Sequence, residues 1–168
     1  MEQLLKLLEK NARLNEDQLS ALLTIPKEKI EAEIARCERE RIILGYNTLI
    51  NWEKIDPTYC SAMITLKVQP KRDFGYDEIA AEILRFDEVE TVWLMSSSSY
   101  DLSVIVRGHN FRDIAMFVAK RLATLDSVTS TTTNFILKRY KEHYITVVEP
   151  EKDAYRGISI SAFDKKKL

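Results

Sequence analysis

The sequence predicts an α+β protein built from two parts, and three observations carry that prediction. Three short stretches with the apolar spacing of helices fill the first forty or so of the 168 residues. Strand-type alternation begins near residue 59, and from there the patterns follow the order strand, helix, strand, strand, helix, strand. That order is typical of the split βαβ motif, with both helices on one face of a four-stranded antiparallel sheet. The predicted fold is an N-terminal three-helix (winged) helix-turn-helix followed by a ferredoxin-like βαββαβ (αβ-plait) domain.

Composition limits the classes of partner. The formal net charge of -1 provides no bulk attraction to nucleic acid or to an anionic membrane, so any such binding must come from a local patch. Cys37 and Cys60 lack the spacing of a CxxC or Cys/His site, so we expect buried reduced thiols and no metal site. No run approaches the ~18 apolar residues of a membrane span, and the N-terminus lacks a signal-peptide core. We therefore expect a cytoplasmic protein without membrane association or a cofactor.

The first part is predicted to contain three helices with a tight turn before the third. Thr24 is expected to cap the third helix, with Pro26 in its first turn, and this helix is expected from Lys27 to about Arg41. The inward-facing positions are Leu4, Leu7, Leu8 and Ala12 in the first helix, Leu19, Leu22 and Leu23 in the second, and Ile30, Ile34 and Cys37 in the third. This is helix-turn-helix organisation, although three such helices would also form an ordinary bundle or a dimerisation cap.

The second part follows a connector that looks extended from Ile42 to Ile50 and ends at Pro57. The expected elements are a strand at 59–68, a helix at 76–86, a hairpin at 89–108, a helix capped by Asn110, and a strand from Val128 to about Arg139. The inward residues of the first of these helices are Ile79, Ala80, Ile83 and Leu84. The inner stripe of the second is Phe111, Ile114, Val118, Leu122 and Leu125. Two further alternating runs, 144–148 and 157–163, are compatible with one more hairpin. We expect domains at 1–45 and 59–148, a linker at 46–58, and a tail at 149–168 with a possible extra strand.

The hairpin predicts a second subunit, because neither of its faces is polar. Leu102, Val104 and Val106 would share one face, whereas Trp93 and Ile105 would lie on the other. An antiparallel sheet in a monomer normally leaves one polar face in solvent. We therefore expect a dimer interface that includes Met63, Trp93 and Ile105. The alternative is that a terminal segment of the same chain covers this face.

Enzymatic chemistry has little support in the residues. The chain has only two histidines, His109 and His143, and no nucleophile or carboxylate pair at a telling spacing. We therefore expect a protein that is not an enzyme, while the fold by itself does not exclude catalysis.

Three segments, in their order along the chain, resemble the Lrp/AsnC family of feast/famine transcription regulators. They are IILGYNTLIN after the third helix, SSYDLSVIV in the hairpin and TTTNFILKRYK in the last strand. The resemblance covers nearly the whole chain. It implies a sequence-specific regulator that binds double-stranded DNA through residues 1–45. It also implies an effector-binding and oligomerisation domain at 59–148, a small-molecule effector such as an amino acid bound between subunits, and a homodimer with tetramers or octamers as further options.

The hairpin turn is the position at which the resemblance places the effector. The candidate residues are Met95, Ser96, Ser97, Ser98, Ser99, Tyr100 and Asp101. Ser98 and Ser99 stand where the family has a glycine and an aspartate, whereas Tyr100 and Asp101 match the family pattern. Serine hydroxyls can bond a ligand carboxylate and Asp101 an ammonium. The alternative is structural: serines form tight turns, and Asp101 would satisfy backbone donors.

The third helix carries the candidate DNA contacts and an unusual number of acids. We expect phosphate or guanine contacts from Lys27 and Lys29, a cytosine contact from Glu31, and backbone clamps from Arg36 and Arg39. Helical pairing is the alternative for the cations, as Lys27 with Glu31, Lys29 with Glu33 and Arg36 with Glu40. Five glutamates balance five basic residues between 27 and 41. Because glutamates repel phosphate, a second reading is a ligand sensor or partner subunit of a paralogous regulator that does not bind DNA.

Overall fold

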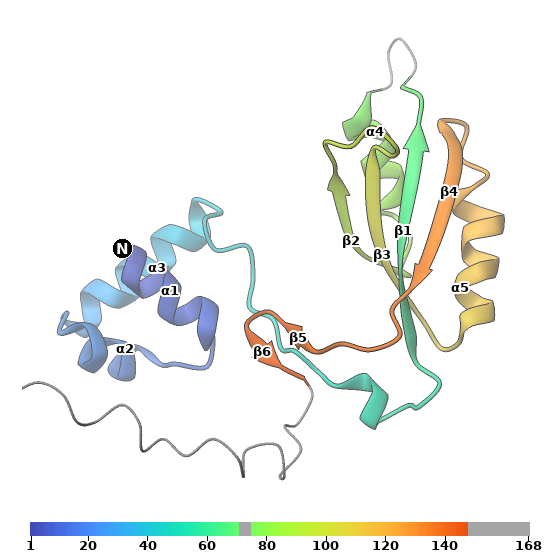
Figure 1. The fold of residues 1–168 in the computed structure, drawn as a ribbon. Helices are drawn as coiled ribbons and strands as arrows, with labels where there is room; N and C mark the ends of the chain where they lie inside the picture. Colours follow the sequence, from blue (N-terminus) through green and yellow to red (C-terminus); the bar gives the residue numbers. More distant parts are fainter. Residues whose placement is uncertain (71–74, 148–168) are drawn as a thin grey trace, which may run out of the picture. The chain divides into compact units, whose positions relative to one another are not determined.

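The computed structural model describes residues 1–70 and 75–147, which divide into two compact units (Figure 1). The first unit contains residues 1–50 together with 141–146, and the second contains 51–140 and Val147. The expected run at 157–163 and the tail at 149–168 lie outside the described residues.

Three helices and a short hairpin form the first unit. The helices are α1 (Glu2–Lys10), α2 (Glu16–Leu23) and α3 (Lys27–Arg39), and the hairpin pairs β5 (Lys141–Glu142) with β6 (Ile145–Thr146). The core consists of Leu4, Leu8, Leu19 and Ile30, and Cys37 is also fully buried. Two expected core residues are exposed, because Ala12 follows the end of α1 and Leu22 lies to one side of the stripe that Leu19 and Leu23 form on the short α2.

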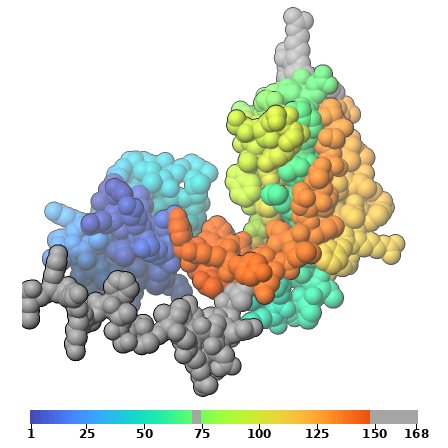
Figure 2. Space-filling model, in the orientation of Figure 1, coloured from blue at the N-terminus to red at the C-terminus, as the bar shows by residue number. Residues whose placement is uncertain are grey.

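The second unit is the expected βαββαβ arrangement. Its elements are η1 (Trp52–Lys54), β1 (Cys60–Val68), α4 (Tyr76–Ile83), β2 (Val89–Leu94), β3 (Leu102–Gly108), α5 (Phe111–Phe117), η2 (Val118–Leu122) and β4 (Val128–Phe135). The strands form one antiparallel sheet in the order β2-β3-β1-β4. Helices α4 and α5 pack on the same face, since their buried residues join one core with those of β1 and β3. In Figures 1 and 2 the sheet lies in front of these helices, so the view is onto the face that they leave open.

Burial follows the predicted alternation in the central strands. Ala62, Ile64 and Leu66 of β1 and Val104 and Val106 of β3 are fully buried beneath the helices. The helix predicted at 76–86, α4, ends at Ile83, three residues early, and Leu84 is 62% exposed rather than buried. At the ends of other elements, Leu94 and Phe111 are also largely exposed, since each is the last or first residue of its element.

The ends of the last helix and strand differ from the prediction for local reasons. Asn110 caps α5 as expected, with its side-chain oxygen accepting from the Asp113 N–H at 2.9 Å. Phe111 does not enter the core but packs edge-on against Phe135, with ring centroids 4.8 Å apart. Strand β4 ends at Phe135 rather than near Arg139. None of the helices within residues 1–70 and 75–147 is long and apolar enough to cross a bilayer.

Candidate DNA-binding and effector-binding sites

The turn between α2 and α3 is fixed by two reciprocal hydrogen bonds. The Ser20 hydroxyl donates to the Ile25 carbonyl at 2.6 Å, and the Ile25 N–H donates to the Ser20 carbonyl at 3.3 Å. Thr24 lies between them with φ 56°, the left-handed conformation that ends many helices. The expectation that Thr24 caps α3 is therefore wrong: Thr24 terminates α2, and Pro26 precedes α3 without a side-chain cap. The role of Ser20 in this turn was not predicted from the sequence. The available signal was a serine in the last turn of the second helix, five residues before Ile25.

Lys27 is held at the start of α3 by the preceding helix. Its ammonium lies 2.9 Å from Asp17, and this bond raises the pKa of Lys27. Lys27 therefore pairs with Asp17 of α2 rather than with Glu31, the alternative expected from the sequence. The spacing of residues within α3 does not predict a partner on another helix. Lys27 thus bridges α2 and α3 by an exposed ion pair, and a phosphate at this position would compete with Asp17.

Arg36 is enclosed by acids of its own helix. It donates to Glu33 at 3.0 Å and also pairs with Glu40, as the helical spacing predicts. These bonds raise the pKa of Arg36 and lower the pKa of Glu33. Because Glu33 is taken by Arg36, the alternative pairing of Lys29 with Glu33 does not form.

Lys29 and Arg39 are therefore the exposed cations of α3 without an ion-pair partner among the described residues. The acids Glu28 and Glu31 are exposed on the same helix, as are the small side chains Ala32 and Ala35. A helix that presents two unpaired cations and small side chains can approach a nucleic-acid groove closely, whereas the exposed acids oppose that approach.

The β2–β3 turn is organised by Asp101. One carboxylate oxygen accepts the Val68 N–H at 2.9 Å and the other accepts the Lys67 ammonium at 3.1 Å. The backbone of Asp101 bonds both neighbouring strands, to Leu66 at 2.9 Å and to Met95 at 2.7 Å. The bond from Val68 is the main cause, and Lys67 a further one, of a lowered Asp101 pKa. This geometry is that of the structural alternative, in which Asp101 satisfies backbone and side-chain donors.

The serines of the turn divide into two kinds. The hydroxyls of Ser97 and Ser99 lie 3.2 Å apart and bond each other, and the Ser99 N–H also contacts Ser97. Ser96 and Ser98 are exposed and have no hydrogen-bond partner within the described part of the chain. Met95 is exposed and Tyr100 half-buried beside them. The turn thus offers hydroxyl groups to a ligand, while its carboxylate is already bonded.

The open face of the sheet gathers the three residues expected at a dimer interface. Met63 of β1 is directly opposite Ile105 of β3. Trp93 of β2 is opposite Ser103, one step along the same face of β3. Met63 is 37% exposed and Trp93 49%, so part of this apolar surface faces solvent within one chain.

Comparisons with known proteins identify both parts. The model of the Lrp/AsnC ligand-binding domain family matches residues 61–146. An uncharacterised HTH-type transcriptional regulator of Bacillus subtilis, YugG, is 46% identical over 140 residues, which is 83% of this chain and 84% of YugG.

Solved structures agree at the level of the fold. A complex of the Neisseria meningitidis transcriptional regulator NMB0573 with L-methionine superposes with a TM-score of 0.70 at 20% identity, covering 88% of this chain and 92% of that one. Escherichia coli AsnC gives a TM-score of 0.66 at 19% identity, covering 83% and 91%. The matched family consists of regulators rather than enzymes. The chain therefore belongs to the Lrp/AsnC family of transcriptional regulators.

Proposed function

We propose that this regulator binds double-stranded DNA sequence-specifically and acts as a cytoplasmic homodimer or larger oligomer whose DNA affinity responds to a small metabolite. In this proposal residues 1–45 form the DNA-binding domain, 46–58 the linker and 59–148 the effector-binding and oligomerisation domain. The observation that carries the DNA-binding role is the helix-turn-helix whose second helix, α3, exposes Lys29 and Arg39 without ion-pair partners in the described residues. Lys27, Glu31 and Arg36 remain candidates for contacts at its edges.

Dimerisation through the open face of the sheet would place two copies of α3 on one DNA duplex. Met63, Trp93 and Ile105 form the apolar part of that face. A second copy is a suitable cover because a two-fold axis brings the same patch from both chains together.

An amino acid or a related metabolite is the effector class that we propose for the Ser96–Asp101 turn. The Neisseria relative was solved with L-methionine. Here the hydroxyls of Ser96 and Ser98 are available to a carboxylate, with Met95 and Tyr100 beside them. Binding at this turn would alter DNA affinity only if the ligand prefers one assembly state over another, as any allosteric effect requires.

A second candidate function rests on the exposed acids of α3. Glu28 and Glu31 would meet the phosphates that Lys29 attracts, and a helix with this balance suits a sensor or partner subunit that leaves DNA contact to a paralogue. The two functions differ in one measurable property, which is direct DNA binding by the purified homo-oligomer.

A genomic-fragment binding selection tests the DNA-binding function. Purified protein at low and moderate salt should enrich fragments that share a pseudo-palindrome, and Lys29→Ala with Arg39→Ala should abolish the enrichment. The matched control removes one cation from α5 and one from η2, Arg112→Ala with Lys120→Ala, and should keep the enrichment. No enrichment at either salt would reject direct binding and favour the partner-subunit function.

Measurements of assembly size test the effector. Light scattering of the full chain with and without each amino acid should show a ligand that changes the oligomer, and Ser96→Ala with Ser98→Ala should weaken that response. An assembly unchanged by every amino acid tried would reject an amino-acid switch at this turn.

A further inference from the structure

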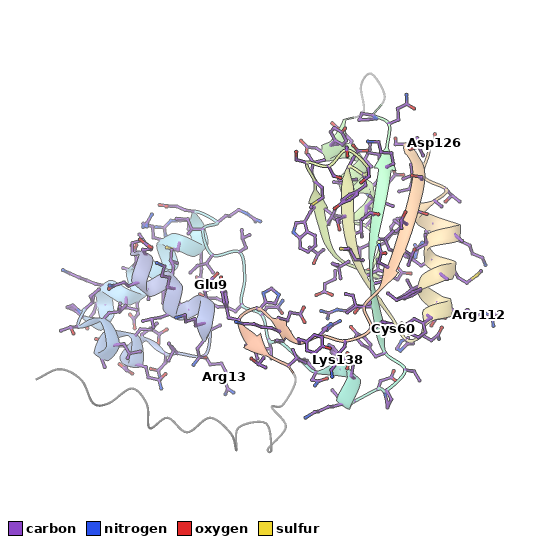
Figure 3. All side chains as sticks on the ribbon, in the orientation of Figure 1. Glu9, Arg13, Cys60, Arg112, Asp126 and Lys138 are labelled. Atoms are coloured by element: carbon purple, nitrogen blue, oxygen red, sulfur yellow. The ribbon has the colours of Figure 1, made fainter. Side chains whose placement is uncertain are left out.

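A cleft opens at the end of the sheet opposite the Ser96–Asp101 turn. It has a volume of about 460 Å³, within the range of small-molecule sites, and lies wholly within the second unit. Val106, Ile114 and Phe117 supply apolar walls, Tyr59 an aromatic one, and Asp87 and Asp113 carboxylates. In Figure 3 the labels of Cys60 and Arg112 mark this end of the sheet, where β1 begins and α5 starts.

The backbone of Gly108 forms part of the cleft because no side chain fits there. A Cβ atom on Gly108 would lie 2.9 Å from Cγ1 of Ile114, so β3 approaches α5 as closely as a glycine allows. The wall that results is part of the packed core of the unit, to which Ile114 and Val106 belong. A ligand would therefore meet a preformed apolar surface.

Two carboxylates of the cleft have no ion-pair partner among residues 1–70 and 75–147. Arg107 lines the cleft but pairs with Glu90, and Glu88 pairs with Arg121 at 3.0 Å. Asp87 has no ion-pair partner among the described residues. Within the part of the chain that the structure describes, the Asp113 carboxylate accepts a neutral hydrogen bond from the Asn110 amide at 2.8 Å and forms no ion pair.

The charge of Asp113 reaches the buried end of β1. Burial raises the pKa of the Cys60 thiol, and the negative charge of Asp113 raises it further. Unbalanced negative charge therefore adjoins the apolar walls.

We propose that this cleft binds a small organic ammonium ion, a primary amine attached to an apolar group of about the size of a phenyl ring. The carboxylates of Asp87 and Asp113 would attract the ammonium, and the apolar group would cover Ile114 and Phe117. A hydrated metal ion suits the same charge less well, because it would leave those apolar walls in contact with water. The site is separate from the proposed effector turn, from which it is divided by the length of β3.

Phenethylamine tests this proposal on the full-length protein. Titration at neutral pH should shift the ¹⁵N–¹H resonances of Gly108 and His109, while those of Ser96 to Asp101 should stay in place. Phenylacetate, with a similar ring and the opposite charge, should cause no such shift. Equal shifts with both compounds, or none with phenethylamine at millimolar concentration, would overturn the proposal, and shifts confined to the serine turn would assign the amine to the effector site instead.

Two single-charge variants separate the cleft from general electrostatics. Asp87→Asn removes an exposed carboxylate of the cleft and should weaken phenethylamine binding roughly three- to five-fold, the range of one partly solvated ion pair. Asp77→Asn removes the same charge from the first turn of α4 and should leave the affinity unchanged. An equal loss in both variants, or no loss in either, would contradict an ammonium site at these carboxylates.

Discussion

Asp101 closes the β2–β3 turn with both oxygens of its carboxylate. One oxygen accepts the Val68 N–H and the other accepts the Lys67 ammonium, so both bonds require a side chain with two acceptor atoms. These bonds lower the pKa of the Asp101 carboxyl. A lowered pKa stabilises the folded state above the unfolded-state value of about 3.9, and this contribution is lost as the pH falls through the folded-state pKa. The residue therefore ties the turn to β1 at neutral pH and releases it in acid.

We expect Asp101→Asn to lower the free energy of unfolding by roughly 1 kcal/mol at pH 7, because the amide keeps one acceptor and loses the charge. The measurement is urea unfolding of both proteins from pH 7 to pH 2.5. The difference between them should shrink below about pH 4, where Asp101 of the unfolded chain begins to take up a proton, and should vanish as the pH falls through the lowered pKa of the folded state. A difference that stays constant over this range would show that the carboxylate charge does not stabilise the turn.

Arg41 follows α3 in a conformation that suits glycine. Its φ is 56°, and the Ile42 N–H donates to the Cys37 carbonyl at 2.8 Å, which is the Schellman arrangement of a helix end. A side chain with a Cβ is strained there by roughly 1 kcal/mol. Arg41→Gly should therefore raise the free energy of unfolding by about 0.5 kcal/mol, since glycine also gains freedom in the unfolded chain. Arg41→Ala, which removes the charge and keeps the Cβ, is the control and should not stabilise the protein.

For single residues, the contacts predicted from the sequence agree with the structure where the spacing along the chain alone decides the contact. The Arg36–Glu40 pair and the Asn110 cap were predictable because both partners lie on one helix end or turn. The Lys27–Asp17 and Asp101–Lys67 pairs were not, because each joins two elements whose relative placement depends on the whole core. The prediction that Thr24 caps α3 was wrong for a related reason, because a threonine between two helices can end the first or begin the second.

Helix α3 combines attraction and repulsion toward DNA on one element. Glu28 stands at the end of the helix that meets base edges in helix-turn-helix proteins, next to Lys29. We expect Glu28→Gln to raise DNA affinity roughly two- to five-fold, because a charge a few ångströms from phosphate in hydrated surroundings contributes up to about 1 kcal/mol. A binding titration on an enriched fragment measures this. Glu78→Gln in α4 is the matched control, and an unchanged affinity for Glu28→Gln would place this glutamate away from phosphate.

Elements were predictable as far as their apolar periodicity extends. The strands β1 and β3 alternate over seven or more residues, and the residues predicted to face inward are buried, although Ser61 and Ser103 on the other face are buried as well. The ends of α4 and β4 were placed too late, because the apolar pattern continues past them through residues that remain exposed, Leu84 after α4 and Leu137 after β4. Periodicity reports which face is apolar, whereas the end of an element depends on what covers it.

The proposed assembly of the whole molecule depends on what covers the open face of the sheet. Trp93 and Leu94 are consecutive in β2, both largely exposed, and they point to opposite faces because side chains alternate along a strand. Only Trp93 shares a face with Met63 and Ile105. This pair of neighbours separates the effect of the open face from that of exposed apolar surface in general.

We expect Trp93→Glu to split the dimer, because it places a charge in the centre of an apolar interface and a matching charge from the second copy faces it. Sedimentation of the variant should give a monomer at concentrations where the wild type is an oligomer. Leu94→Glu should keep the wild-type size. The Trp93 variant should also lose most of its DNA affinity, since a single helix-turn-helix forfeits the effective concentration of its partner. An intact dimer in Trp93→Glu would exclude the open face as the interface, and a monomer with undiminished DNA affinity would show that α3 does not depend on pairing.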